Sequence, residues 1–170
     1  MDDAAERVVL VDERDREVGT APKLQAHVDG VLHRAFSVFV LNAQGEVMLQ
    51  RRAAGKYHSP GLWTNTCCGH PRPGEPVAAA ARRRLREEMG FDCELAPAGT
   101  FLYRADVGAG LVEHELDHLF TGCHDADPSP DPAEAGEWRW QPPRDALAEA
   151  QAHPERFTPW FALALRELNG

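Results

Sequence analysis

The clearest hydrophobic signal is the segment Phe36–Leu41, which is apolar at nearly every position and rich in branched and aromatic side chains. A short continuous run of this composition predicts a strand that is buried on both faces. A turn-forming segment, Asn42–Gly45, follows it, and Glu46–Gln50 has the length and composition of a further strand. We therefore predict a β-hairpin in this part of the chain.

The N-terminal part carries weaker extended patterns. Arg7–Val11 is apolar and β-branched, a turn is predicted at Asp12–Asp15, and Glu17–Thr20 follows, so a strand or small hairpin is expected. Lys23–His33 has neither a clear helical nor a clear strand period, and we interpret it as a loop.

The strongest helical signal is at Val77–Met89. Pro76 precedes it and Gly90 follows it, which is the usual arrangement of these residues around a helix. Apolar residues four positions apart predict a stripe that faces the core: Val77, Ala81, Leu85 and Met89.

The rest of the chain alternates short elements with loops rich in glycine, proline or charge. The loops are predicted at Arg51–Gly61, Gly69–Pro76 and Asp125–Ala135; the strands at Leu62–Cys68, Gly99–Ala105, Val112–Gly122 and Trp138–Gln141; and the helices at Pro143–Ala152 and Pro159–Leu168. No repeat or long linker divides the chain. We expect one α/β domain over residues 1–170, a mixed β-sheet sandwiched between helices.

Composition narrows the possible partners. The net charge of −9 opposes binding to nucleic acid, and it requires that cations gather locally if the substrate is an anion. No stretch approaches the roughly 20 apolar residues of a membrane helix, and the start of the chain is acidic rather than basic. We expect a cytoplasmic protein, with no membrane partner and a monomer favoured. The four cysteines form no CxxC pair, which indicates reduced thiols rather than a zinc finger.

A first motif begins at Gly69 and runs through Glu75 to Arg83-Arg84-Leu85-Arg86-Glu87-Glu88-Met89-Gly90-Phe91. Its spacing resembles the Nudix box, Gly-x5-Glu-x7-Arg-Glu-U-x-Glu-Glu-x-Gly-U, in which U is bulky and apolar; this resemblance implies the Nudix fold. Carboxylates such as Glu88 suit a hard cation like Mg²⁺, although an EExG helix end is also common as a solvated surface. Arg84 stands where the box has Glu, which speaks against ordinary diphosphate hydrolysis.

A second motif is Ser59-Pro60-Gly61-Leu62-Trp63-Thr64-Asn65-Thr66-Cys67-Cys68-Gly69-His70-Pro71. It resembles the PGxWTNxxCGHP signature of the type I isopentenyl-diphosphate isomerases, and this resemblance implies that Cys68, not Cys67, is catalytic. Without the resemblance, Cys68 would be interpreted as one more small buried hydrophobic residue. If the segment is a strand, the two cysteines point to opposite faces, so only one can reach a site.

The same family uses two early histidines, the histidine of CGH and an ExE pair as metal ligands. The resemblance therefore implies a metal site made by His27, His33, His70, Glu113 and Glu115. Imidazole and carboxylate ligands suit Mn²⁺, Zn²⁺ or Mg²⁺, and two glutamates two residues apart on a strand share a face. A second ion, a Mg²⁺ bound to the diphosphate, is implied at Glu88.

Cations and aromatic residues complete the predicted site. A solvated run of loop charges is the alternative for the basic residues, but the family pattern implies that Lys23, Arg52 and Lys56 bind the diphosphate, while Arg51 faces elsewhere. Tyr103 and Trp160 match aromatic positions of the family, and core packing is the alternative for both.

The reaction implied by this resemblance converts isopentenyl diphosphate to dimethylallyl diphosphate through a tertiary carbocation. Cys68 and Glu115 are the expected proton-transfer pair, and the sequence leaves open which residue donates first. Tyr103 is expected to hydrogen-bond this pair, and Trp160 to stabilise the cation. Two other functions are considered: a Nudix hydrolase of a nucleoside diphosphate derivative, and a non-catalytic protein that binds a metal or an isoprenoid diphosphate.

Overall fold

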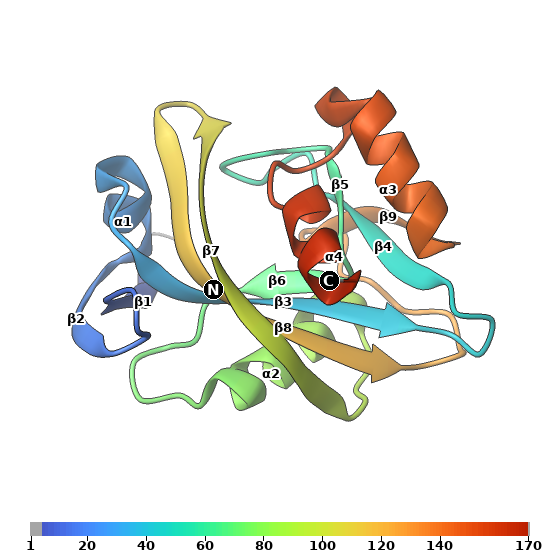
Figure 1. The fold of residues 1–170 in the computed structure, drawn as a ribbon, viewed down its shortest axis with the longest axis horizontal. Coiled ribbons are helices and arrows are strands. Elements are labelled where there is room, and N and C mark those ends of the chain that lie inside the picture. Colours follow the sequence, from blue (N-terminus) through green and yellow to red (C-terminus); the bar gives the residue numbers. More distant parts are fainter. Residues whose placement is uncertain (1–4, 170) are drawn as a thin grey trace.

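The structure of the protein is a computed structural model, and residues 5–169 are described. Figure 1 shows the elements in chain order. They are β1 (Arg7–Val11), β2 (Glu17–Pro22), α1 (Lys23–Asp29), β3 (His33–Leu41), β4 (Val47–Arg52), β5 (Trp63–Thr64), β6 (Cys67–Gly69), α2 (Val77–Met89), β7 (Leu95–Gly108), β8 (Leu111–Cys123), β9 (Ala135–Gln141), α3 (Pro143–Ala152), the short 3₁₀ helix η2 (Pro154–Arg156) and α4 (Phe161–Asn169).

The apolar strand β3 is the centre of a mixed sheet. It pairs in parallel with β8 from His33–Glu115 to Leu41–Cys123, and in antiparallel fashion with the short strand β6. The long hairpin β7–β8 extends this sheet on one side, and β1 and β2 add to it near the start of β3. The presence of both parallel and antiparallel pairs confirms the predicted mixed sheet.

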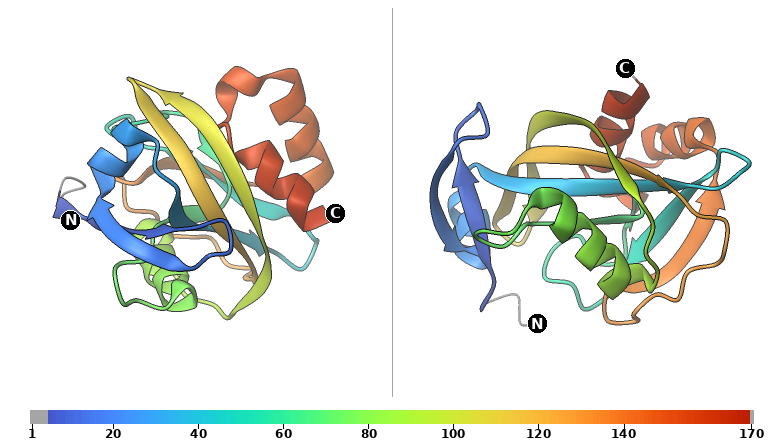
Figure 2. Two further views of the ribbon diagram at one scale, coloured as in Figure 1. Left: turned by 60° about the vertical axis from the view of Figure 1, so that its left-hand side comes forward. Right: turned by 90° about the horizontal axis from the view of Figure 1, so that it is seen from below.

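Helices cover both faces of β3, which explains its continuous apolar sequence. Phe36, Val38 and Val40 pack in one buried cluster with residues of α2. Phe39, on the opposite face, packs in a second cluster with Phe161 and other residues of α3 and α4. The right-hand view of Figure 2 shows α2 on one side of β3 and β8, and α3 and α4 on the other. The predicted arrangement of a sheet between helices is therefore confirmed.

Helix α2 has the bounds that its sequence predicts. Ala81, Leu85 and Met89 are fully buried, and Val77 packs at the edge of the same cluster. Gly90 ends the helix in the left-handed conformation, with φ of 73°. A residue with a side chain is strained there, so glycine is the expected choice.

The interpretation of Lys23–His33 as a loop was wrong, because Lys23–Asp29 forms α1. Its buried face carries Ala26 and His27, while Leu24 and Val28 are exposed. A small residue and a histidine face inward and the apolar side chains face outward, so the usual amphipathic period is absent. Tertiary contacts of the buried face, rather than the hydrophobic pattern, therefore stabilise this short helix.

The predicted hairpin between β3 and β4 is confirmed, but it is short, because the two strands pair at Leu41–Val47 next to the turn. Beyond that pair, β4 leaves β3 and pairs with the distant strand β9. The predicted strand Leu62–Cys68 is likewise divided into β5, which pairs with β4, and β6, which pairs with β3. At the break, Thr66 donates to the Met48 carbonyl and Asn65 to the Val38 carbonyl, which joins the two parts of the sheet.

Within residues 5–169, no helix combines the length and the apolar character that crossing a bilayer requires.

Candidate functional site

Alternation along β8 places three acidic side chains on one face of the sheet. Glu113, Glu115 and Asp117 lie two residues apart, and all three are buried. His33 is the residue of β3 that pairs with Glu115, so its side chain lies on the same face. Buried carboxylates require partners, and the surrounding histidines supply them.

The turn that ends α1 brings a second histidine to this face. Gly30 adopts a φ of 67°, which reverses the chain between His27 and His33. The Gly30 carbonyl accepts a hydrogen bond from Nδ1 of His114, at 3.0 Å, and this bond holds the turn against β8. As a result, the ring centroids of His27 and His33 are 4.9 Å apart.

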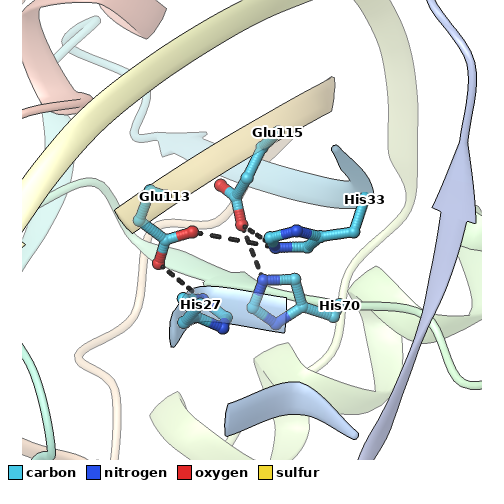
Figure 3. Close-up of side chains that lie close together, drawn as sticks. All are labelled: His27, His33, His70, Glu113 and Glu115. Carbon is cyan, nitrogen blue, oxygen red and sulfur yellow. Dashed lines mark hydrogen bonds and ion pairs between the residues drawn. The ribbon is translucent and has the colours of Figure 1, made fainter. Parts of the chain in front are cut away.

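Figure 3 shows five side chains that converge from α1, β3, β8 and the segment after β6. His27 Nε2 lies 3.2 Å from Glu113 Oε1, and His33 Nε2 lies 3.2 Å from Glu115 Oε2. His70 Nε2 lies 2.6 Å from the same Glu115 oxygen. One ligand atom from each residue can be chosen so that all five lie within 4.8 Å of one another. The five residues predicted as metal ligands are thus in one buried cluster.

Hydrogen bonds behind the cluster orient two of its three imidazoles. His27 Nδ1 donates to the Lys23 carbonyl at 2.7 Å, and His33 Nδ1 donates to the Val31 carbonyl at 2.8 Å. In a neutral ring, this turns the Nε2 lone pair toward the carboxylates. His27 Nε2 and Glu113 Oε2 are buried without a hydrogen-bond partner. Nitrogen and oxygen lone pairs that face each other in this way fit a cation between them, so the cluster can hold a metal ion.

The two glutamates have opposite electrostatic environments. Burial, and then the charge of Glu113, raises the pKa of Glu115 to about 7. Burial also acts to raise the pKa of Glu113, but the imidazoles of His27 and His58, which favour the charged carboxylate when they carry a proton, outweigh it and leave that pKa well below its ordinary value. Without a bound ion, Glu113 therefore carries the charge, while Glu115 can take up or release a proton near neutral pH.

Tyr103 contacts Glu115 from behind the site. It is the β7 partner of Glu115, and its hydroxyl donates to Glu115 Oε1. Burial, and then the nearby charge of Glu115, raises the pKa of Tyr103 well above its ordinary value, so the hydroxyl keeps its proton and remains a donor. Through this hydrogen bond, Tyr103 can orient the Glu115 carboxylate.

A cavity of about 320 Å³ opens beside the cluster, lined by Cys68, Glu115 and Trp160 among others. Cys68 is the β6 partner of Ser37 and faces this cavity, whereas Cys67 pairs with Val38 and is buried in the core beneath α2. The expectation that the two cysteines point to opposite faces is confirmed. Burial, and then the charge of Glu88, raises the pKa of Cys68, so its thiol stays protonated.

The predicted basic residues reach the same cavity. Arg52 donates to the His58 carbonyl at 3.1 Å, and its guanidinium lies 5.7 Å from the centre of the Trp160 ring. Lys23 and Lys56 line the cavity too, and each pairs with a carboxylate. Arg51 points away and pairs with Glu137 on β9, as expected.

Glu88, the predicted ligand of a second ion, is buried at the cavity wall. Its Oε1 lies 3.5 Å from Arg84, and its Oε2 has no hydrogen-bond partner. Glu87 is more exposed and pairs with Arg83 and Arg84. Arg84, the departure from the Nudix box, thus lies among the carboxylates of the helix end and neutralises part of their charge.

His58, Asp117 and Glu134 are among the residues of this region that were not predicted. His58 Nε2 lies 2.9 Å from Glu113 Oε1, and Asp117 accepts a hydrogen bond from Ser37 at 2.7 Å. Extending the Glu113–Glu115 alternation by one step would have found Asp117. His58 and Glu134, the partner of Lys56, lie in loops whose sequence carries no periodic signal.

Comparison with known proteins adds the family. The family model of the NUDIX domain matches residues 31–161 of this chain. Isopentenyl-diphosphate Delta-isomerase 2 of Aromatoleum aromaticum is 53% identical, with 97% of this chain and 90% of the relative covered. The isopentenyl-diphosphate Delta-isomerase of Halorhodospira halophila is 52% identical over 95% of this chain and 94% of its own.

Solved structures agree on the fold. A protein from Deinococcus radiodurans, 24% identical, superposes with a TM-score of 0.80 and covers 97% of this chain and all of its own, 100%. A MutT protein from Methanosarcina mazei, 19% identical, gives a TM-score of 0.68 over 81% of this chain and 93% of its own.

Proposed function

Since this chain belongs to the NUDIX domain family and, within it, to the isopentenyl-diphosphate Delta-isomerases, we propose that its cavity binds isopentenyl diphosphate and moves the double bond to give dimethylallyl diphosphate. The chain is an enzyme of isoprenoid metabolism. One observation carries the assignment of its residues: the thiol of Cys68 and the carboxylate of Glu115 line the same cavity, together with Trp160.

Cys68 and Glu115 form the proposed proton-transfer pair. Strand β3 lies between β6 and β8, so the two side chains enter the cavity from either side of β3. The reaction adds a proton to the terminal methylene carbon, which leaves a tertiary carbocation, and then removes a proton from the carbon next to the oxygen-bearing one. An alkene is a weak base, so the donor and acceptor must be held in place in a cavity that excludes water.

Tyr103 and Trp160 support this pair in different ways. The Tyr103 hydroxyl donates to Glu115 and thereby fixes the orientation of its carboxylate. Trp160 lines the cavity and is almost completely buried, so the face of its indole can stabilise a carbocation. Such a contact contributes about 2 kcal/mol when water is excluded. Tyr103 is therefore a positioning residue, whereas Trp160 contacts the substrate.

His27, His33, His70, Glu113 and Glu115 are the proposed ligands of a divalent ion, Mn²⁺, Zn²⁺ or Mg²⁺. When bound, such an ion supplies positive charge that orients Glu115 and favours its ionised form. His27 and His33 each donate the Nδ1 hydrogen to a backbone carbonyl, which leaves the Nε2 lone pair of each ring free to bind the ion. These two hydrogen bonds support the assignment.

The diphosphate is proposed to bind Lys23, Arg52 and Lys56, with a Mg²⁺ held by Glu88. These three cations line the same cavity as Cys68 and Trp160, in a protein of net charge −9. Local concentration of positive charge is required if an acidic protein is to bind such an anion. The single domain over residues 1–170, the cytoplasmic location and the monomeric state stay predictions.

The other two functions are less well supported. A hydrolase of nucleoside diphosphate derivatives would need the full carboxylate set on α2, and Arg84 neutralises part of that set. A protein that only binds would have no need of a protonated thiol beside a titratable carboxylate. We expect no phosphate release from a panel of nucleoside diphosphate derivatives.

Proton NMR in D₂O tests the proposed reaction. With isopentenyl diphosphate, Mg²⁺ and Mn²⁺, we expect new dimethylallyl methyl signals that carry solvent deuterium, and we expect them to vanish after chelation. Unchanged substrate in the presence of protein shown to contain metal would disprove the proposal.

A further inference from the structure

The acidic, proline-rich loop before β9 packs against the helix that forms one wall of the cavity. Ser129 N donates to the Met89 carbonyl at 2.9 Å, and Asp131 N donates to the Glu88 carbonyl at 3.0 Å. A Cβ atom at Gly90 would lie only 2.2 Å from the Ser129 carbonyl oxygen, so the close approach depends on this glycine. The loop is thereby held at the end of α2, and its last residue, Glu134, lines the cavity.

Glu134 forms ion pairs with two of the basic side chains that line this cavity. Its Oε2 lies 2.7 Å from Lys56 Nζ and 3.1 Å from an Arg84 guanidinium nitrogen. All three side chains are mostly buried, with exposed fractions of 21% for Glu134, 12% for Lys56 and 19% for Arg84. Burial acts to raise the pKa of Glu134, but the charges of Arg84 and Lys56 outweigh it and lower that pKa, so the group is anionic.

We propose that Glu134 is an internal counter-ion of the diphosphate site, which the diphosphate displaces from Lys56 and Arg84 as it binds. This inference rests on the proposed function, because it requires that Lys56 contacts the diphosphate. The Glu134 carboxylate and the phosphoryl oxygens are both anionic, and both accept hydrogen bonds from the same donors. They therefore compete for Lys56 and repel each other across the cavity.

Such a counter-ion suits this reaction. The substrate and the product carry the same diphosphate, so interactions with it are alike before and after the double bond moves. Binding of this kind lowers KM without raising kcat, and when it is too tight it slows release of the product. A carboxylate that must be displaced weakens the binding of the diphosphate. It also neutralises Lys56 and Arg84 when no substrate is bound.

The backbone of Glu134 is held independently of its side chain. The Glu134 carbonyl accepts from Ala53 N at 3.0 Å, and Glu134 N donates to the Asp131 carbonyl at 2.9 Å. The side chain can therefore move, or be made neutral, while the loop keeps its place. Glu134→Gln therefore tests the effect of the negative charge of this side chain without disturbing the loop.

The test compares Glu134→Gln with Glu137→Gln. Both replace a carboxylate by an amide of the same shape, and Glu137 pairs with Arg51 outside the cavity, so it controls for the change in total charge. Titration calorimetry would measure the affinity for inorganic pyrophosphate at a fixed free Mg²⁺ concentration. We expect Glu134→Gln to bind about tenfold more tightly or better, because removing one anion near the ligand strengthens its attraction to Lys56. We expect Glu137→Gln to match the unaltered protein.

Steady-state kinetics with isopentenyl diphosphate should also show tighter binding by Glu134→Gln. We expect Glu134→Gln to have a lower KM and no gain in kcat, with stronger inhibition by pyrophosphate. Glu134→Ala provides a second variant, and it should also bind pyrophosphate more tightly, since the charge rather than the shape of the side chain is the cause. Glu134→Asp keeps the charge and should not tighten binding.

If Glu134→Gln and Glu134→Ala both bind pyrophosphate with unchanged or lower affinity, the proposal that Glu134 is a counter-ion is wrong. A lower affinity would indicate that Glu134 instead positions the basic side chains. Lys56→Ala and Arg52→Ala separate this failure from a larger one. If they weaken pyrophosphate binding while Glu134→Gln has no effect, only the counter-ion is wrong. If they leave pyrophosphate binding unchanged, the proposed diphosphate site is wrong, and the counter-ion with it.

Discussion

Two adjacent cysteines show how much the position of a single residue decides. Cys67 is fully buried beneath α2, with Val38 as its neighbour across the strand pair. Cys68, one position later, faces the cavity together with Glu115 and Trp160. The side chains of a strand alternate between its faces, so a chemically identical thiol is a core residue in one place and a candidate catalyst in the next.

The matched variants Cys68→Ala and Cys67→Ala test this division. We expect Cys68→Ala to lose about 10²–10⁴-fold in kcat, the usual contribution of a positioned proton-transfer group, while its fold and metal content are retained. Cys67→Ala should stay active, although the cavity it leaves in the core costs about 1–2 kcal/mol of stability. Turnover assays, circular dichroism and elemental analysis measure these outcomes. An inactive Cys67→Ala beside an active Cys68→Ala would mean that the catalytic cysteine has been misassigned.

At the scale of elements, the start of α2 depends on a pair that belongs to the Nudix box. Glu75 accepts two hydrogen bonds from the Arg83 guanidinium, at 2.8 and 2.9 Å, and a third from Arg72 N at 3.0 Å. The hydrogen bond from Arg83 outweighs the opposing effect of burial and lowers the pKa of Glu75 below its ordinary value of 4.5. This pair ties the loop before α2 to the helix and so helps to shape the segment that carries His70.

Glu75→Gln should therefore destabilise the protein in a pH-dependent way. Because the pKa of Glu75 is lowered on folding, its stabilising effect is present above the unfolded value and is lost as the pH falls through the folded value. We expect a loss of about 1 kcal/mol at pH 7 and a smaller difference from the unaltered protein below pH about 4. Urea unfolding across this range measures the difference. Glu155→Gln, at an exposed position of η2, should show little effect at any pH.

At the scale of the whole molecule, the metal cluster joins segments that are distant in sequence. His27 lies on α1, His33 on β3, His70 after β6, and the glutamates on β8. An ion held by all of them would tie the N-terminal hairpin and α1 to the central sheet. Binding that occurs only in the folded state stabilises that state by mass action.

Removal of metal should lower the melting temperature. At an ion concentration about a hundred times the dissociation constant, the stabilisation is about 2.7 kcal/mol, which corresponds to about 5–10 °C for a chain of this size. Calorimetry before and after chelation measures the shift. We expect His27→Gln to lose the metal-dependent part, and His153→Gln, at a half-buried position outside the cluster, to keep it. A melting temperature that chelation leaves unchanged would contradict the proposed ligand set.

Much of the site could be predicted because its residues lie in recognisable local patterns. Alternation on one strand predicted that Glu113 and Glu115 share a face, and the resemblance to known isomerases selected His27, His33 and His70 from eight histidines. His58 and Glu134 could not be found in this way. They lie in loops, where side-chain direction follows from packing against remote elements and not from a local period.

The sequence alone determined the features that depend on near neighbours: the buried strand β3, the bounds of α2 and the opposite directions of Cys67 and Cys68. These follow from backbone geometry, which repeats over two or four residues. Only the tertiary structure decided that Lys23–Asp29 is a helix, that β4 pairs with β9, and that Glu134 lies against Lys56. Those outcomes depend on contacts between segments far apart in the chain, whose energies no local pattern contains.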